Sequence, residues 1–214
     1  MKSCYLYFFI LIIGTSAMVS CQKEIDGSTD GGGGPVVPVK QKPKLGTTWY
    51  YRYYIYTFGG ALSSAENLTF KATSEETIGG EKWLKVVDVA QDTVVWLLNE
   101  KTGGLYQYTN SSSNLLCKFP AALNDSYATF NENVAETFTV KGVNDTLTTG
   151  VGDIPVNYYE GVRTLNLIDL IWYNEYAWVV RKTQYRYFLA PPPPSGPGNV
   201  RYKYYTLFLD DIVY

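Results

Sequence analysis

Short runs of aromatic and β-branched residues, separated by turn residues, recur along the chain from residue 48 to its end. The first run, residues 48–58, reads TWYYRYYIYTF, and a period of two is the only repeat that it fits well. Glycine, asparagine and aspartate separate the later runs at intervals of roughly 8 to 12 residues, which is typical of antiparallel β-proteins. The sequence therefore predicts an all-β domain of roughly ten to twelve strands, arranged as a single antiparallel barrel, half-barrel or sandwich.

The later runs indicate where the other strands are expected. A weak helical pattern over 165–172 is the only alternative to strand, and its flanking residues do not extend it. The four prolines at 191–194 cannot lie inside a sheet, because proline lacks the N–H that the ladder needs, so 190–198 is expected to form a hairpin loop. Strands are expected at 67–73, 82–89, 93–98, 105–108, 115–119, 127–130, 134–141, 154–159, 162–168, 170–173, 176–188 and 200–214, with a turn at 99–104.

The first 21 residues, MKSCYLYFFILIIGTSAMVSC, have the organisation of a secretory signal peptide, with a positive charge at Lys2 and an apolar run over 5–13. That run is shorter than the roughly 20 residues that span a bilayer, which disfavours the alternative of a retained membrane anchor. The segment ends in Met18-Val-Ser-Cys21, which resembles the bacterial lipobox. In a lipobox the cysteine is acylated and becomes the mature N-terminus, so the resemblance implies that residues 1–20 are removed and Cys21 is lipidated.

The segment after Cys21 cannot form a core, because four glycines at 31–34 are followed by a proline-bearing stretch. Such chain is flexible or extended, so residues 21–43 are expected to be a lipidated tether and 44–214 the β-domain. Gln22 is not the aspartate that signals inner-membrane retention, and Lys23-Glu24 resembles the charged export signal of surface lipoproteins of the Bacteroidota. We expect export, a lipid anchor in the outer membrane and, from this signal, exposure at the cell surface.

Composition excludes several classes of function. The chain contains no histidine, which removes Ser-His-Asp and Cys-His nucleophiles, histidine general bases and zinc sites with imidazole ligands. Lysine and arginine number 18 against 20 aspartates and glutamates, which gives a net charge of −2 and no basic excess for nucleic acid. Neither a calcium loop nor a phosphate-binding loop is recognisable. We therefore expect no metal, no cofactor and no nucleic-acid partner.

One cysteine remains in the domain once Cys4 and Cys21 are set aside. A single thiol cannot form an intramolecular disulfide. Cys117 lies in the apolar run 114–119, where a small buried side chain is expected rather than a reactive one.

Several segments of the domain resemble uncharacterised β-rich lipoproteins of the Bacteroidota. In that family an opening Gly-x-x-Trp strand is followed by a Gly-Leu-Tyr hairpin, a Phe-Pro turn, a Gly-Asp-x-Trp turn and closing strands. Asn124 and Tyr127 replace the glycine and tryptophan of the last motif. The resemblance implies a secreted β-domain on a lipid anchor and transfers no catalytic residue. The segments are 46–51, 104–106, 115–120, 124–127, 176–188 and 205–209.

Carboxylates are the remaining candidates for catalysis, and none is assigned a catalytic role. Asp210 and Asp211 are adjacent on a strand, so they are expected to point to opposite faces and not to act as a pair. Glu75-Glu76 is expected beside a turn, and Asp88 and Asp92 are expected to flank a hairpin. A glycosidase built from distant acids stays an open alternative.

Tyrosine is the better indication of function, because 20 tyrosines occur and the strand at 48–58 carries them on both faces. Trp49, Tyr51, Tyr53 and Ile55 are expected to face the core. Tyr50, Tyr54 and Tyr56 alternate with them, so they are the candidate ligand-binding residues on the outer face. The alternative is that these tyrosines only complete cross-strand ladders.

Three functions are consistent with these features. The first is a non-enzymatic outer-membrane or surface lipoprotein that binds a glycan, a peptide or another envelope component through an aromatic β-surface. The second is a carrier of an apolar ligand inside an open barrel. The third, a carboxylate-dependent glycosidase, requires two acids within about 10 Å of each other in a cleft.

Overall fold

A computed structural model describes residues 41–131, 134–163, 167–189 and 199–214. The described residues belong to one compact unit, Val39–Tyr214. The expected signal peptide, Cys21, most of the tether and the proline loop lie outside the described residues. None of the described residues form a helix with the length and hydrophobicity needed to cross a membrane.

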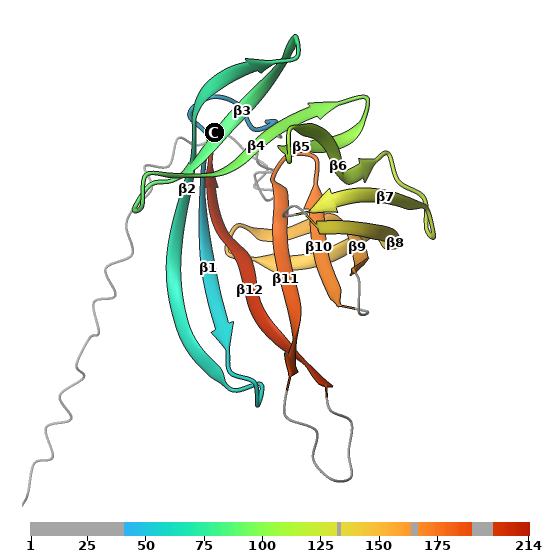
Figure 1. The fold of residues 1–214 in the computed structure, drawn as a ribbon. Coiled ribbons are helices and arrows are strands. Elements are labelled where there is room, and N and C mark those ends of the chain that lie inside the picture. The colour runs from blue at the N-terminus through green and yellow to red at the C-terminus, as the bar shows by residue number, and fades with distance from the viewer. Residues whose placement is uncertain (1–40, 132–133, 164–166, 190–198) are drawn as a thin grey trace, which may run out of the picture. The chain divides into compact units, whose positions relative to one another are not determined.

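The predicted all-β fold is confirmed, since the twelve described strands form one antiparallel sheet and no described residue is helical (Figure 1). The expected strand at 162–168 is divided: its first residues end β9 and its last begins β10. The weak helical pattern was at 165–172, and its described part from residue 168 belongs to strand β10. The strands are β1 Thr48–Tyr56, β2 Leu62–Ile78, β3 Glu81–Asp88, β4 Thr93–Lys101, β5 Gly103–Thr109, β6 Ser112–Phe119, β7 Ser126–Asn131, β8 Val134–Thr149, β9 Gly152–Arg163, β10 Ile168–Asn174, β11 Trp178–Leu189 and β12 Asn199–Val213.

The order of strands in the sheet is β6-β5-β4-β3-β2-β1-β12-β11-β10-β9-β8-β7. Every neighbouring pair is consecutive in sequence except β1 and β12, which join the two ends of the domain in the middle of the sheet. The edge strands β6 and β7 are consecutive in the chain, and the Tyr127 hydroxyl on β7 donates a hydrogen bond of 2.8 Å to the Leu116 carbonyl on β6. The sheet therefore curls until its two edges meet, as in a nearly closed barrel (Figure 1).

Aromatic rings fill the inner side of this sheet. Trp49 stacks on Trp178 with ring centroids 5.8 Å apart, and its indole N–H donates to the Ala177 carbonyl at 3.0 Å. The Tyr51 hydroxyl donates to the Val179 carbonyl at 2.6 Å, so a buried polar group has its partner. The larger buried members of the core are Trp49, Tyr51, Leu98, Leu105, Phe138, Tyr159, Ile171, Tyr173 and Leu209.

Strand β1 has the two faces that its sequence predicts, but only its first half is fully covered on the inner side. Trp49 and Tyr51 are buried, whereas Tyr53 and Ile55 are half-buried. Beyond Tyr51, β1 continues with β2 and β12 toward the end of the sheet opposite the C-terminus (Figure 1). The period of two therefore gives the direction of each side chain without giving the depth of its burial.

Cys117 is a free cysteine with no exposed surface, and burial raises the pKa of its thiol. We expect a thiol-specific reagent to leave the native chain from residue 22 to 214, whose one cysteine is Cys117, unmodified near neutral pH and to modify that thiol once the chain is unfolded in urea. A Ser63→Cys variant supplies an exposed thiol on β2 as a control. Labelling of native Cys117 at the rate of that control would contradict its burial.

Candidate functional site

The outer face of β1 carries two of the three predicted binding tyrosines around one depression. Tyr50 is 41% exposed and lines a hollow of about 290 Å³, and Tyr54 lines a neighbouring hollow of about 400 Å³. Both hollows include Asn67 of β2 and Asp210 of β12, so they form one continuous depression over β1. We call it the β1 hollow. The residues that line it and belong to the outer face are Tyr50, Arg52, Tyr54, Ala65, Asn67, Thr69, Asp210 and Asp211.

The hollow exists because large side chains on β1 stand opposite small ones on β2. Tyr50 pairs with Thr69, and Tyr54 pairs with Ala65. Directly opposed residues in an antiparallel pair have Cβ atoms about 5 Å apart, so a short side chain leaves the space beside a ring unfilled. The rings of Tyr50 and Tyr54 therefore form one wall of the depression.

Tyr56 does not belong to this group. The Lys203 ammonium lies 4.8 Å from the centroid of its ring, and a register shift follows Ile55 in the pairing of β1 with β2. The predicted set of three tyrosines is thus divided between the β1 hollow and the far end of the strand.

A β-bulge in β12 brings two carboxylates into the hollow. Tyr50 pairs with Asp211 and Tyr51 pairs with Leu209, which leaves Asp210 as the extra residue. The sequence expectation that Asp210 and Asp211 point to opposite faces is therefore wrong, because a bulge interrupts the alternation of side chains. Both aspartates line the hollow beside Tyr50.

Charge in the hollow is mainly negative. The Arg52 guanidinium lies 2.9 Å from the Asp210 carboxylate, and this hydrogen bond raises the pKa of Arg52. Asp211 adds a second carboxylate, against which Arg52 is the only basic side chain among the lining residues. The arrangement offers hydrogen-bond acceptors, one guanidinium and the Asn67 amide within reach of two rings.

Aromatic side chains elsewhere on the outer face stack on each other. Tyr158 of β9 and Trp172 of β10 are paired across the strands, with centroids 4.8 Å apart and planes inclined by 16°. The Arg181 guanidinium covers Trp172 at 4.6 Å. This region fits the cross-strand ladder that the sequence left as an alternative. Tyr50 differs, because no ring or cation contacts it among the described residues.

The other acids singled out in the sequence have structural partners. Glu75 and Glu76 form ion pairs with Lys82 and Lys85 at 3.2 and 3.1 Å. Asp88 accepts hydrogen bonds from the backbone N–H groups of the turn that follows it, and Asp92 adopts a positive φ of 50° in the same turn. These residues build turns and strand pairs and do not converge on a cleft.

Sequence reasoning missed a buried ionic cluster on the inner face. Arg163 of β9 pairs with Glu136 of β8 and with Asp169 of β10, and neither carboxylate side chain has exposed surface. No local pattern could have identified this cluster, because its three members come from three strands and are brought together only by strand pairing.

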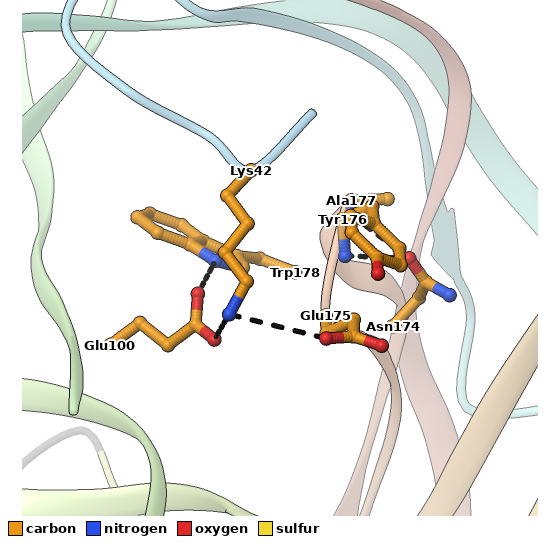
Figure 2. Close-up of polar contacts among 7 residues, drawn as sticks. All are labelled: Lys42, Glu100, Asn174, Glu175, Tyr176, Ala177 and Trp178. Carbon is orange, nitrogen blue, oxygen red and sulfur yellow. Dashed lines mark hydrogen bonds and ion pairs between the residues drawn. The ribbon is translucent and has the colours of Figure 1, made fainter. Parts of the chain in front are cut away.

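The start of the domain is also held by an ionic contact. Figure 2 shows Lys42, at the end of the expected tether, between Glu100 of β4 and Glu175 of the β10–β11 turn. Glu100 also accepts a hydrogen bond from the Trp178 indole at 3.4 Å, and its hydrogen bond with Lys42 raises the pKa of that lysine. The contact ties the first described residues to β4 and to the β10–β11 turn.

Comparison with known proteins supplies no relative for the chain, since no family model, no curated protein and no solved structure matches it. Its function is therefore inferred from its own residues.

Proposed function

We propose that the protein is a non-enzymatic, lipid-anchored envelope protein that binds a glycan in the β1 hollow. The observation that carries the proposal is the depression itself, in which exposed Tyr50 and half-buried Tyr54 stand beside Asp210, Asp211 and Asn67.

This combination suits a sugar ring. A pyranose presents an apolar face of C–H groups and an edge of hydroxyl groups, and it can lie on a tyrosine ring while its hydroxyls donate to carboxylates. The hollow is open and shallow, which suits an extended chain more than an enclosed small molecule. Its excess of carboxylates favours a neutral or amino sugar over an acidic one.

The anchor completes the proposal. Acylation at Cys21 and a tether up to residue 43 would hold the domain at the outer membrane, where envelope and extracellular glycans are accessible. The alternative of an apolar carrier has less support, because bulky rings such as Trp49, Tyr159 and Tyr173 occupy the inner side of the sheet where such a ligand would lie.

A glycan array probed with the chain from residue 22 to 214 tests the proposal, followed by calorimetry on any glycan that binds. Replacing Tyr50 or Tyr54 by alanine is expected to weaken binding about tenfold or more, because each substitution removes a stacking surface worth about 1.4 kcal/mol. Asp211→Asn is expected to weaken binding by a smaller factor, since it keeps the shape and removes a charged acceptor.

Phe130→Ala is the matched control, because Phe130 is 40% exposed and lies on β7, away from the hollow. The proposal fails if no glycan binds, or if Phe130→Ala weakens binding as much as Tyr50→Ala does. Cleavage of a bound glycan during the assay, abolished by Asp210→Asn or Asp211→Asn, would favour the glycosidase instead.

A further inference from the structure

The end of the sheet opposite the C-terminus can be followed in Figure 1. It carries aromatic, basic and exposed apolar side chains that the proposed glycan site does not use. They come from the β1–β2 turn, the end of β11 and the beginning of β12. We call this group the distal patch. It consists of Tyr56, Phe58, Leu62, Arg186, Tyr202, Lys203 and Tyr204.

Cation–ring contacts fix the basic residues of the patch. The Lys203 ammonium lies 4.8 Å from the Tyr56 ring centroid, and the Arg186 guanidinium lies 3.5 Å from that of Tyr204. Each contact holds a cation over an aromatic face without neutralising its charge, because no carboxylate takes part. Both cations therefore remain able to attract an anion.

Ring contacts and strand pairing connect the members of the patch in two groups. Phe58 packs against Tyr202 with centroids 5.9 Å apart, and Tyr202 contacts Tyr204 at 6.5 Å, which Arg186 covers. Tyr56 pairs with Leu62 across the β1–β2 turn and contacts Lys203. Tyr202 and Lys203 are adjacent on β12, so the two groups lie on opposite faces of the sheet and meet at the same end of it.

Two large apolar side chains are exposed at this end of the sheet. Phe58 is 43% exposed and lies within a turn closed by a 2.8 Å hydrogen bond from the Thr57 N–H to the Ala61 carbonyl, and Leu62, which is 55% exposed, follows that turn. The turn holds both side chains at the end of the sheet, where they are available to insert into an apolar environment.

The charge of this end differs from that of the whole chain. The described stretches 54–65, 185–189 and 199–205 contain three basic residues and no aspartate or glutamate, whereas the chain has a net charge of −2. A local excess of positive charge is complementary to an anionic surface. Together with exposed apolar side chains and interfacial tyrosines, it matches the requirements of a membrane surface.

We propose that the distal patch docks onto an anionic lipid surface. Phe58 and Leu62 enter the headgroup region, Arg186 and Lys203 lie beside the lipid phosphates, and the tyrosine rings occupy the polar–apolar boundary. This contact does not depend on the lipid anchor or on the glycan site.

Vesicle flotation with unacylated protein, residues 22–214, tests the proposal without interference from acyl chains. This chain retains all twelve strands and every described core residue. Vesicles of phosphatidylcholine containing about one third phosphatidylglycerol are expected to bind it, and neutral phosphatidylcholine vesicles are expected to bind it at least tenfold more weakly. Raised salt is expected to weaken the binding to anionic vesicles.

The double variant Arg186→Gln, Lys203→Gln is expected to reduce binding to anionic vesicles about 30-fold, and Phe58→Ser, Leu62→Ser at least tenfold. The matched controls are Lys71→Gln, an exposed cation on β2, and Leu123→Ser at a residue that is 60% exposed. The controls should bind as the unaltered chain does, and thermal unfolding checks that each variant is folded.

Three results would overturn the proposal. Equal binding to neutral and anionic vesicles would show that the positive charge of the patch does not direct the binding. Absence of binding to both would show that the patch does not dock onto lipid. The third result is a soluble acidic polysaccharide that binds as tightly as the anionic vesicles. If the double variant Arg186→Gln, Lys203→Gln abolishes that binding, the patch binds an acidic glycan instead.

Discussion

Raising the pH from about 9 to about 11 is expected to remove roughly 4 kcal/mol from the free energy of unfolding. Burial raises the pKa values of Tyr51, Tyr159 and Tyr173 above the usual 10.0. The folded state therefore keeps these protons while the unfolded state loses them. This stabilisation is fully present below pH 10 and falls as the pH rises further, by about 1.4 kcal/mol per tyrosine per pH unit.

A loss of this size is comparable with the total stability of a small domain, which is about 5–15 kcal/mol. We therefore expect cooperative alkaline unfolding with a midpoint at about pH 11 to 12, in which circular dichroism and tyrosinate absorbance change together. Ionisation of all tyrosines near pH 10 with the β-signal intact would contradict this expectation.

Tyr51→Phe separates the effect of ionisation from that of packing. It keeps the ring but removes the 2.6 Å hydrogen bond to the Val179 carbonyl, so it should cost about 1 kcal/mol at neutral pH. Above pH 10 the stability of the variant should fall less steeply with pH, by the contribution of one tyrosine. Tyr50→Phe, at a 41% exposed position, should change neither quantity.

The strands were predictable because their signal is local. Alternating apolar residues placed β1 within two residues of its observed bounds, and the buried faces of Trp49 and Tyr51 were predicted correctly. The length of β2 was not predictable, since its ends contain residues such as Ser64 and Glu76 that have no strand signal and are held by pairing with β1 and β3. The order of strands also required contacts between the two ends of the domain.

The candidate site was predictable only in part, for a similar physical reason. Tyr50 and Tyr54 could be assigned to the outer face from alternation alone. The depth of the hollow depends on Ala65 and Asn67 of β2, and its charge depends on the bulge at Asp210. A bulge reflects the register of two strands that are distant in sequence, and the residues around Asp210 include no glycine that would indicate one.

Trp49→Ala is expected to lower the free energy of unfolding by about 3–5 kcal/mol, which is the usual cost of removing a buried aromatic side chain. Trp49 is 2% exposed, stacks on Trp178 and reaches across β12 to the Ala177 carbonyl at the start of β11. The substitution leaves a cavity at the point where the first and last strands of the domain are joined. Urea unfolding measures the loss.

Trp49→Phe distinguishes ring packing from the hydrogen bond at this position. It retains an aromatic ring against Trp178 and leaves the Ala177 carbonyl without the indole N–H, so we expect a smaller loss of about 1–2 kcal/mol. Tyr50→Ala is the control on the same strand, and its exposed position predicts a change within about 0.5 kcal/mol. If Trp49→Ala lowered the stability no more than Tyr50→Ala does, the packing of the Trp49 indole against Trp178 could not be what holds β1 to β11. The assignment of inner and outer faces along β1 would then have to be reversed.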